Sequence, residues 1–355
     1  MKIIHVLFSM LSAGGTETML IDIINQQSKT AKIFLIIINN EVSEKLIATI
    51  NDKVEIISLR KRINDKIDLI RTFYKIHKLV RQINPDIIHS HDHNLIPLFF
   101  QWRKKTFYTP HILNIPTPYL RFYRKVFAIS KAVQEDLKTR ANIDALLVYN
   151  GIHVDEYLQK ESYELAENKT LSIIQLGRLS CKKGQTTAIE AIALLKSKYP
   201  LVKIHLDFVG NGEDFEKLDR LVKEKNLSEL ITFRGVQDRD WVKNNLRQYD
   251  LLIQPSLYEG FGLTIIEGLA SGLPIIMTDS GGPKEIFDIL QAGIIIEPNN
   301  PEELAEKIKN IYECYCNSTI KDTHYLLQDR QKLNIFDVKT TAQNYLDNYI
   351  KYQPL

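Results

Sequence analysis

Short apolar runs alternate with helix-patterned stretches along the chain, and this alternation constrains the fold more than any other feature. The runs are continuously apolar, which is typical of parallel strands covered by helices on both faces. In the first half the predicted strands are Ile3–Phe8, Lys32–Ile38, Val54–Leu59, Ile87–His89, Ile112–Ile115, Val126–Ile129 and Leu146–Tyr149. In the second half they are Ser172–Leu176, Lys203–Val209, Ile231–Arg234, Leu251–Ile253, Pro274–Met277 and Gly293–Ile296. The pattern predicts an α/β protein with two consecutive, doubly wound parallel-sheet domains.

The chain is too long for one core. Its 355 residues exceed the size at which a single hydrophobic core usually stops growing. A polar stretch rich in Glu, Gln and Lys, residues 155–169, separates the two series of strands. The sequence therefore predicts Rossmann-like domains over residues 1–160 and 161–335, followed by a helix-patterned segment over residues 336–355.

Composition indicates a folded protein in a reducing compartment. Hydrophobic residues make up 44% of the chain and charged residues 25%, as in ordinary globular proteins. The three cysteines, Cys181, Cys314 and Cys316, give no disulfide framework. Residues 1–13 resemble a short signal peptide but also fit a first strand that leads into a glycine turn, and the regular alternation after them favours the strand. Because no apolar stretch reaches the ~18–20 residues that span a bilayer, we expect a cytoplasmic protein.

Positive charge gathers in the first half of the chain. Residues 1–155 carry 22 Lys and Arg against 14 Asp and Glu, whereas residues 156–355 carry 24 against 29. The basic clusters and the aromatic residues interleaved with them are Arg60, Lys61, Arg62, Arg103, Lys104, Lys105, Arg121, Arg124 and Lys125, with Trp102, Phe107, Tyr108, Tyr119, Phe122 and Tyr123. This mixture predicts peripheral contact with an anionic membrane surface. A nucleic-acid surface, which we do not expect, and a solvated basic face are the alternatives.

Residues 258–268 form the most informative motif. They follow a predicted buried strand and open an apolar helix, so the first N–H groups of that helix lack partners within it and attract negative charge. Gly260 and Gly262 allow the backbone to approach a ligand closely. The carboxylates of Glu259 and Glu267 flank this corner. A phosphate site with two acceptors for hydroxyl groups suits a nucleotide-sugar.

This motif resembles the E-x7-E signature of family 4 glycosyltransferases, which are retaining enzymes of the GT-B architecture, with two Rossmann-like domains that face a cleft. The resemblance implies that Glu259 holds the transferred sugar and that Glu267 accepts hydrogen bonds from the ribose. It further implies that the backbone N–H groups of Leu263 and Thr264 bind the donor phosphates. The final helix of the family crosses back to the first domain, and we expect the same here.

A second motif follows the predicted strand Ser172–Leu176. Residues 177–184 read Gly-Arg-Leu-Ser-Cys-Lys-Lys-Gly and match the G-R-x-x-x-x-K-G pattern of the family. The resemblance implies that Arg178 and Lys183 neutralise the donor diphosphate. One fork-shaped and one point cation suit the charge that develops on a departing diphosphate, although a plain basic surface loop would look similar.

Further candidate donor contacts lie at strand ends, where ligands of parallel sheets bind. Gly14 and Gly15 follow the first strand, where bare backbone can approach a diphosphate. Two pairs lie where the family seats its nucleobase: Gly210 with Asn211, and Val236 with Gln237. None of these glycines belongs to a G-x-G-x-x-G fingerprint, which disfavours an NAD enzyme.

Two segments resemble metal sites. Residues 89–93 read His-Ser-His-Asp-His, a cluster with the right ligand types but without a second ligand set elsewhere in the sequence. In the family this segment faces the acceptor, so His91, Asp92 and His93 are acceptor-side candidates. The tripeptide 238–240, Asp-Arg-Asp, is interpreted as the start of a helix. We therefore expect no metal.

One feature of the family is missing from its expected place. Many members carry a histidine in a T-x-H motif after a first-domain strand, close to the reacting sugar. With the strand placed at Ile112–Ile115, Pro116 and Thr117 follow, and no histidine does. Its role would then fall to the acceptor-side candidates or to the acceptor itself, unless the strand is misplaced.

These patterns together predict a retaining glycosyltransferase. It would move a sugar from a UDP- or GDP-sugar to a hydroxyl of a glycan or lipid-linked glycan, in surface polysaccharide biosynthesis of the capsule or O-antigen type. We expect Glu259, Arg178 and Lys183 to be the catalytic residues, and no cofactor to be needed. The alternatives are a sugar-nucleotide epimerase of the same architecture and a non-catalytic nucleotide-sugar-binding partner subunit.

Overall fold

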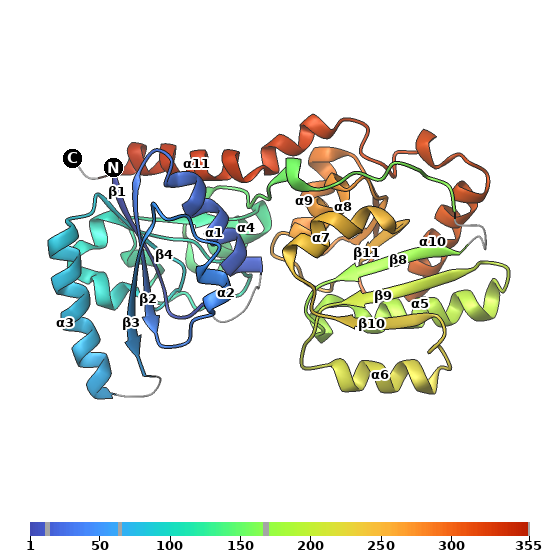
Figure 1. The fold of residues 1–355 in the computed structure, drawn as a ribbon, viewed down its shortest axis with the longest axis horizontal. Coiled ribbons are helices and arrows are strands. Elements are labelled where there is room, and N and C mark those ends of the chain that lie inside the picture. The colour runs from blue at the N-terminus through green and yellow to red at the C-terminus, as the bar shows by residue number, and fades with distance from the viewer. Residues whose placement is uncertain (11–14, 63–65, 166–169, 354–355) are drawn as a thin grey trace. The chain divides into compact units, whose positions relative to one another are not determined.

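The structure is a computed structural model that describes residues 1–10, 15–62, 66–165 and 170–353. The chain divides into two compact units, shown in Figure 1. The first unit comprises residues 1–152 and 335–355, and the second comprises residues 153–334.

The division falls eight residues before the predicted boundary after residue 160. Backbone hydrogen bonds explain the difference. The N–H group of Leu158 donates to the carbonyl oxygen of Lys243 at 3.1 Å, and that of Lys160 donates to Ser271 at 2.9 Å. The polar stretch after residue 152 therefore packs on the second unit instead of linking the two.

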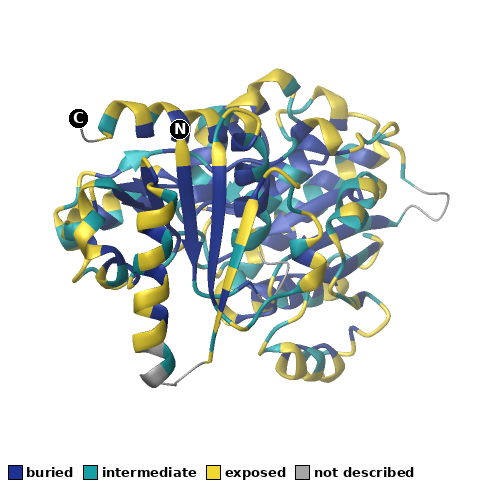
Figure 2. Cartoon of the chain, turned by 60° about the vertical axis from the view of Figure 1, so that its left-hand side comes forward, coloured by how far each residue is buried: buried dark blue, intermediate teal, exposed yellow. Residues whose placement is uncertain are grey.

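The first unit contains a seven-stranded parallel sheet of order β3-β2-β1-β4-β5-β6-β7. Its strands are β1 Lys2–Leu7, β2 Lys32–Asn39, β3 Glu55–Lys61, β4 Ile87–Ser90, β5 Thr106–Tyr108, β6 Lys125–Ala128 and β7 Leu146–Leu147. Its helices are α1 Gly15–Gln27, α2 Glu44–Ile47, α3 Lys66–Ile83, η1 Ile96–Lys105, η2 Leu120–Phe122, α4 Lys131–Ala141 and α11 Val338–Tyr352. The central strands β1, β2 and β4 are buried along most of their length (Figure 2). Their continuous apolar sequences suit this two-sided burial.

The second unit contains a six-stranded parallel sheet of order β10-β9-β8-β11-β12-β13. Its strands are β8 Leu171–Leu176, β9 Ile204–Val209, β10 Ile231–Gly235, β11 Leu251–Gln254, β12 Ile275–Thr278 and β13 Ile294–Ile296. Its helices are η3 Val154–Glu156, η4 Cys181–Lys183, α5 Gln185–Lys198, α6 Phe215–Glu224, α7 Arg239–Asn245, η5 Leu246–Gln248, α8 Leu263–Ala270, α9 Gly282–Leu290, α10 Pro301–Cys316 and η6 Ile320–Asp322. The short helix η7, Arg330–Phe336, runs across the residue at which the chain passes from the second unit to the first. The order of strands reverses between β8 and β11, and between β1 and β4 in the first sheet. Ligands of doubly wound sheets bind at the carboxyl edge beside such a reversal.

One predicted strand was wrong. Residues Ile112–Ile115 are not a strand, and the strand that follows β4 in the chain and pairs with it is β5, Thr106–Tyr108. All three residues of β5 are buried, whereas Ile112 is 65% exposed. A three-residue strand directly after Arg103-Lys104-Lys105 is too short to show an apolar run, so the sequence pattern favoured the isoleucines instead.

The last helix, α11, belongs to the first unit and packs against α1 (Figure 1). Its Tyr345 and Tyr349 are buried against the sheet. Tyr349 Oη lies 2.5 Å from His89 Nδ1, and Tyr345 Oη lies 3.2 Å from Thr109 Oγ1. Two tyrosines at helical spacing thus fasten the end of the chain to the first domain.

The basic and aromatic residues of the first unit divide into buried and exposed groups. Phe107, Tyr108 and Tyr123 are core residues, so they cannot meet a membrane as the sequence pattern suggested. Tyr119 is 44% exposed and Phe100 is 47% exposed. Within the described residues, no helix combines the length and the apolar character needed to cross a membrane.

Candidate functional site

Two loops at the carboxyl edge of the second sheet pack backbone against backbone. The loop after β8 begins at Gly177, whose N–H group donates to the carbonyl oxygen of Val209 at 2.9 Å. The loop after β9 begins at Gly210, whose φ of +138° is rarely adopted by residues with a side chain. A Cβ atom there would lie 2.0 Å from the carbonyl oxygen of Gly177. Glycine at residue 210 therefore brings the expected nucleobase loop against the loop that carries Arg178.

The other expected nucleobase residues extend this edge. The N–H group of Gly210 donates to the carbonyl oxygen of Gly235 at 2.8 Å, so the loop after β10 lies beside the loop after β9. Val236 is 69% exposed. Asn211 Oδ1 accepts from the N–H group of Gly212 at 2.8 Å, and Gln237 Nε2 donates to the carbonyl oxygen of Arg234, in β10, at 3.0 Å. The structure thus brings all four candidates to one edge, and Val236 presents an exposed apolar side chain there.

Lys183 and Glu259 form the centre of the candidate donor site. Lys183 Nζ lies 2.5 Å from Glu259 Oε2, and both side chains are largely buried. Lys183 ends η4, and the next residue is Gly184 with a φ of +71°. A Cβ atom at Gly184 would lie 1.8 Å from the carbonyl oxygen of Pro255. This close backbone approach places the Lys183 loop against the loop that carries Glu259.

Hydrogen bonds hold the backbone and the carboxylate of Glu259. Its N–H group donates to the carbonyl oxygen of Ser280 at 3.0 Å, and its own carbonyl oxygen accepts from the N–H group of Gly282 at 3.1 Å. Gln254 Nε2 lies 3.4 Å from Glu259 Oε2, and Thr264 Oγ1 donates to Gln254 Oε1 at 3.2 Å. Groups from β11, α8 and the start of α9 therefore set the position of this carboxylate.

The amino end of α8 is a candidate anion site next to that pair. Gly262 precedes the helix with a φ of +108°, a conformation that favours glycine. Leu263 and Thr264 then supply the first N–H groups, and the first turn contains no acidic side chain. The positive end of the helix dipole is therefore not offset locally, which favours a phosphate there.

Glu267 has a partner that the sequence did not reveal. Tyr157 Oη donates to Glu267 Oε1 at 2.9 Å. Tyr157 is 3% exposed and follows η3 in the stretch that was interpreted as a linker. Only the fold shows that this stretch packs beside α8, so no sequence pattern could have identified the tyrosine.

Arg178 is directed toward a different carboxylate. Its Nε lies 2.9 Å from Glu213 Oε2, and the two side chains are 71% and 56% exposed. An ion pair this exposed is weak, so the guanidinium can leave Glu213 at little cost when a diphosphate competes for it. Glu213 was not among the expected site residues.

The first unit has expected site residues at the carboxyl edge of its own sheet. Gly15 is exposed and begins α1, while the expected contact Gly14 lies outside the described residues. Asp92 Oδ2 accepts from the N–H group of Phe8 at 2.7 Å, and burial raises the pKa of Asp92. Burial and the neighbouring Asp92 also raise the pKa of Glu17, in the first turn of α1.

Two family models match the chain in succession. The model described as Glycosyltransferase Family 4 matches residues 13–156, and the model described as Glycosyl transferases group 1 matches residues 156–325. Together they span most of both units. The chain belongs to the family 4 glycosyltransferases.

Curated relatives have related descriptions. An uncharacterised glycosyltransferase of Methanocaldococcus jannaschii is 29% identical over 184 residues, which are 52% of this chain and 48% of the relative. The poly(glycerol-phosphate) alpha-glucosyltransferase of Bacillus subtilis is 26% identical over 225 residues, 63% of this chain and 32% of the relative. The chain thus spans about half the length of the first relative and a third of the second.

A solved structure shows the same fold. HepE of Anabaena, in complex with UDP and glucose, has a TM-score of 0.77 at 21% identity and covers 98% of this chain and 99% of its own. This likeness and the two parallel sheets confirm the predicted GT-B architecture of two Rossmann-like domains.

A histidine in the T-x-H pattern follows the strand β5. Because β5 is Thr106–Tyr108, the residues that follow it are Thr109, Pro110 and His111, which read T-x-H. The prediction that no histidine stands there was wrong, and its cause was the misplaced strand. His111 Nε2 lies 3.2 Å from His91 Nδ1, so the structure joins the missed residue to an expected acceptor-side residue.

The other two acceptor-side candidates lie beside this histidine pair in the chain. Tyr123 Oη donates to the carbonyl oxygens of Asp92 and His93 at 3.3 and 3.2 Å. Asp92 is thus held by its backbone and by its carboxylate, which suits a group that must keep a fixed position for an acceptor.

Nitrogen atoms of His5, His89 and His91 lie within 4.8 Å of one another, close enough to suggest a metal site. Each of these three residues already hydrogen bonds through both ring nitrogens. His89 Nδ1 meets Tyr349 Oη at 2.5 Å and His89 Nε2 meets Thr109 Oγ1 at 2.8 Å. A metal would need nitrogen lone pairs that these bonds use, so the group is better described as a hydrogen-bonded network.

The tripeptide 238–240 starts a helix, as predicted. Asp238 Oδ1 accepts from the N–H group of Trp241 at 2.7 Å and caps α7. This is a standard helix-capping role for aspartate.

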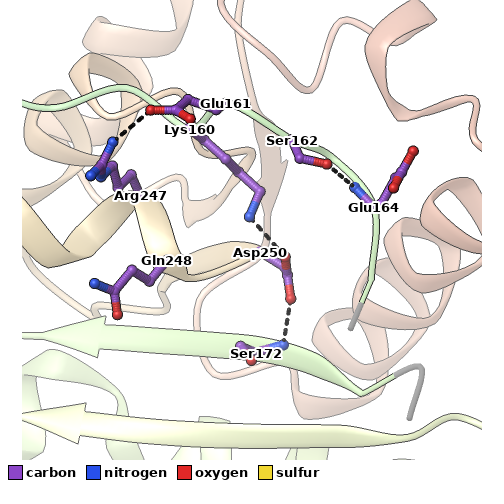
Figure 3. A pocket seen from close by; sticks show the side chains of 8 residues that line it. All are labelled: Lys160, Glu161, Ser162, Glu164, Ser172, Arg247, Gln248 and Asp250. Atoms are coloured by element: carbon purple, nitrogen blue, oxygen red, sulfur yellow. Dashed lines mark hydrogen bonds and ion pairs between the residues drawn. The ribbon is translucent and has the colours of Figure 1, made fainter. Parts of the chain in front are cut away.

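A separate pocket of about 460 Å³ lies at the opposite edge of the second sheet (Figure 3). Ser172 and Asp250 line it at the amino ends of β8 and β11. Lys160 Nζ lies 2.9 Å from Asp250 Oδ1, while Asp250 Oδ2 accepts from the N–H group of Ser172 at 2.9 Å. Arg247 pairs with Glu161 at 2.9 Å. These ion pairs hold residues 158–164 against the second domain. The pocket lies at the amino ends of the strands, whereas ligands of parallel sheets bind at the carboxyl ends, so we do not expect the donor to bind there.

Proposed function

We propose that this protein is a retaining glycosyltransferase that uses a UDP- or GDP-sugar. Its acceptor would be a hydroxyl of a glycan or lipid-linked glycan, in the biosynthesis of a capsule or O-antigen type surface polysaccharide. The observation that carries the proposal is the Lys183–Glu259 pair beside the amino end of α8. It combines a cation and helix N–H groups for phosphate with a carboxylate for a sugar hydroxyl.

Each donor group has a residue suited to it. Lys183, Arg178 and the amino end of α8 neutralise the diphosphate. Glu267, oriented by Tyr157, accepts from the ribose hydroxyls, and Glu259 accepts from the transferred sugar. Because these cations and N–H groups supply the positive charge, no metal is required.

The transfer breaks the bond between the anomeric carbon and the diphosphate oxygen. A bond forms from that carbon to the acceptor oxygen, whose proton leaves with the diphosphate. Charge develops on the departing diphosphate, so the fixed positive groups stabilise the transition state more than the ground state. Removing one such group typically lowers the rate by about 10²–10³-fold.

Two related proteins support the choice of substrates. HepE of Anabaena was solved with UDP and glucose, which favours UDP as the nucleotide. The Bacillus subtilis relative is named for glucosyl transfer to poly(glycerol-phosphate), which favours a polymeric acceptor.

We also propose that the protein is cytoplasmic and that a basic-aromatic face of its first unit rests on an anionic membrane. This face is made by α3, η1 and η2. Ile70 and Tyr74 of α3 are 60% and 71% exposed. Arg103 and Arg121 lie over the rings of Phe100 and Phe122 at 4.7 and 4.9 Å, and those two rings are 5.6 Å apart. Cations beside exposed aromatic rings suit the headgroup region, where each cation contributes about 1 kcal/mol.

Vesicle flotation tests the membrane contact. We expect binding to vesicles rich in phosphatidylglycerol, weaker binding at high salt, and little binding to phosphatidylcholine. Replacing Arg103 and Arg121 with glutamate should abolish binding, whereas the same change at Lys196 and Lys198, in the second unit, should not. Equal binding to both lipids would count against the electrostatic part of the proposal.

Nucleotide binding and turnover test the function itself. We expect UDP or GDP to raise the melting temperature, since a ligand at 100 times its dissociation constant adds about 2.7 kcal/mol. Diphosphate release should then depend on an added acceptor. Conversion of the donor without an acceptor would indicate an epimerase instead, and binding without any turnover would indicate a partner subunit.

A further inference from the structure

Four histidines meet on one face of the first sheet and at its carboxyl edge. His5 of β1 is in register with His89 of β4, and their ring centroids are 5.3 Å apart. His91 and His111 follow β4 and β5. The His91 ring stacks between those of His5 and His111, with centroids 5.3 and 5.4 Å away. The group therefore extends from the interior of the domain to the edge where ligands bind.

Three of these rings and one amide form a continuous chain of hydrogen bonds. His111 Nε2 lies 3.2 Å from His91 Nδ1, and His91 Nε2 lies 3.0 Å from His5 Nδ1. His5 Nε2 lies 2.8 Å from Oε1 of Gln27, the last residue of α1. Both links between rings join an Nδ1 to an Nε2, so every ring in the chain must carry its proton on the same nitrogen.

The rings of this chain are neutral at physiological pH. Burial lowers the pKa of His5 and of His111 to about 4. Burial and the neighbouring imidazoles hold the pKa of His91 well below its usual range. A neutral imidazole has one N–H donor and one acceptor nitrogen, so the chain has a single direction at any moment.

Gln27 sets that direction. An amide oxygen only accepts, so His5 carries its proton on Nε2 and offers Nδ1 to His91. The same reasoning then gives His91 and His111 as Nε2–H tautomers. His111 Nδ1 is left as a lone pair at the end of the chain, buried and without a hydrogen-bond partner among the described residues.

We propose that His5 and His91, in the direction that Gln27 sets in the wild type, are positioning residues that hold His111 in the Nε2–H tautomer, so that its Nδ1 accepts a hydrogen bond from a sugar hydroxyl at the carboxyl edge. The proposal rests on the transferase function for the identity of that ligand. Because His111 already has the Nε2–H tautomer in the free protein, sugar binding does not have to supply the free energy of a change of tautomer. It also makes the site require a hydroxyl donor at that point, since a group without one would leave Nδ1 buried and unpaired.

His89 and α11 hold the loop that carries His111. Thr109, two residues before His111, meets His89 Nε2 at 2.8 Å and Tyr345 Oη at 3.2 Å. This second set of bonds fixes the backbone of the loop, while the Gln27 chain fixes the ring. The two roles can therefore be separated by mutation.

Two similar substitutions of His5 test the proposal. The amide of Asn stands near the position of Nδ1, so His5→Asn keeps an acceptor for His91. The amide of Gln stands near the position of Nε2, so His5→Gln keeps only the bond to Gln27. Both variants place one neutral amide at a fully buried position, and fluorescence of Trp102 in a Trp241→Phe background checks that the first domain is folded.

The first readout is the tautomer of His111 in the free protein, measured by nitrogen-15 NMR of histidine-labelled samples with His111→Asn to assign its signals. We expect one Nε2–H form in the wild type and in His5→Asn, and a mixture of tautomers in His5→Gln. A mixture or an Nδ1–H form in the wild type would overturn the proposal. This readout needs no turnover, so it stands even if the protein proves not to be a transferase.

The second readout is kinetic. We expect His5→Gln to lower kcat/KM about five- to tenfold, mainly through KM for the substrate that contacts His111, while His5→Asn stays within about twofold of the wild type. Equal losses in the two variants would show that His5 acts only through stability. Failure of the wild type to turn over would instead contradict the proposed function.

Discussion

Lys183 Nζ lies 2.5 Å from Glu259 Oε2, just before the amino end of α8. The two side chains come from loops 76 residues apart, and the close approach of Gly184 to Pro255 brings them together. A diphosphate at α8 would compete with Glu259 for the ammonium group. We expect this competition to release the Glu259 carboxylate, so that it can accept a hydrogen bond from the sugar hydroxyl. Phosphate binding and sugar binding would thus be coupled through one ion pair.

Loss of the ammonium group should remove most activity. We expect Lys183→Ala to lower kcat/KM about 10²–10³-fold, because a cation facing the developing charge is lost and Glu259 then repels the diphosphate. Diphosphate release under donor-limited conditions measures it. The matched control is Lys182→Ala, which removes the exposed neighbouring lysine and should stay within about twofold of the wild type. Similar losses in both variants would point to the loop fold and not to the ion pair.

Arg178 should matter for catalysis and not for stability. Its pair with Glu213 is exposed, and such pairs contribute only about 0.2–1 kcal/mol to folding. We expect Arg178→Ala to lower kcat by about 10²-fold or more with an unchanged urea midpoint. Glu213→Ala should keep activity at or above that of the wild type, because it frees the guanidinium. A full loss of activity on removing Glu213 would show that the ion pair itself is needed.

Tyr157 should act on donor affinity. We expect Tyr157→Phe to weaken UDP binding about tenfold, since hydrogen bonds to charged groups contribute about 1.5–3 kcal/mol and the bond to Glu267 would be lost. Isothermal titration with UDP measures the change.

Tyr163→Phe is the control for Tyr157. It also removes one tyrosine hydrogen bond of the second domain, to the carbonyl oxygen of Gly272 at 2.7 Å, a backbone group that is not among the expected donor contacts. Its UDP affinity should stay unchanged. Equal weakening in the two variants would mean that the effect comes from general destabilisation.

The buried histidines should make the first domain sensitive to acid. Burial lowers the pKa of His5 from about 6.5 to about 4 in the folded state. Between pH 6.5 and pH 4, His5 is protonated in the unfolded chain and neutral in the folded domain. Protonation therefore favours the unfolded chain, and the free energy of unfolding falls as pH falls from 6.5 toward 4. His5 alone accounts for about 1.4 kcal/mol per pH unit in this window, and above pH 7 it contributes no slope.

Urea unfolding at pH 7, 6 and 5 measures this slope, with Trp102 as the fluorophore in a Trp241→Phe background. The free energy of unfolding should depend less steeply on pH in His5→Asn. Between pH 6 and 5 we expect its slope to be smaller by about 1.4 kcal/mol per pH unit, the value for one proton. The control is His324→Asn, which removes an exposed histidine and should leave the slope unchanged. A wild-type midpoint that does not fall between pH 6 and 5 would contradict the neutral state of the cluster.

Asp250 should be a stability residue. Its carboxylate pairs with Lys160 at 2.9 Å, and the two side chains are only 9% and 7% exposed. Asp250→Ala leaves that ammonium buried without its counter-ion, with a hydrogen bond to the carbonyl oxygen of Tyr249, and breaking a buried ion pair in this way typically costs about 3–5 kcal/mol. Urea unfolding followed by Trp241 in a Trp102→Phe background measures the loss in the second domain.

Glu161→Ala is the control for Asp250. It breaks a pair in the same pocket whose carboxylate is 86% exposed, and it should change stability by about 0.5 kcal/mol or less. If the two variants are equally stable, the Lys160–Asp250 pair is not the element that holds residues 158–164.

Local sequence patterns predicted the two parallel sheets and most of the candidate donor site. Continuous apolar strands such as Leu251–Ile253 and Ser172–Leu176 predicted two parallel sheets, because two-sided burial demands apolar residues at every position. The donor-edge candidates Arg178, Lys183, Glu259 and Glu267 lie in short motifs whose spacing follows from a strand, a turn and a helix. Those motifs could be identified without knowledge of any distant contact.

The position of β5 and the side-chain hydrogen bonds between distant segments could be identified only from the tertiary structure. They depend on which segments of the chain come together in the fold. A three-residue strand is too short to show a recognisable apolar run. The sequence therefore placed β5 wrongly, and His111, which follows β5, was missed. Tyr157 joins Glu267 across 110 residues, and His89 meets Tyr349 across 260 residues. Hydrogen bonds of this kind need two side chains in one place, which periodicity along the chain does not specify. The histidine chain shows this most clearly, since each of its residues lies in an ordinary local sequence and only the packed sheet joins them.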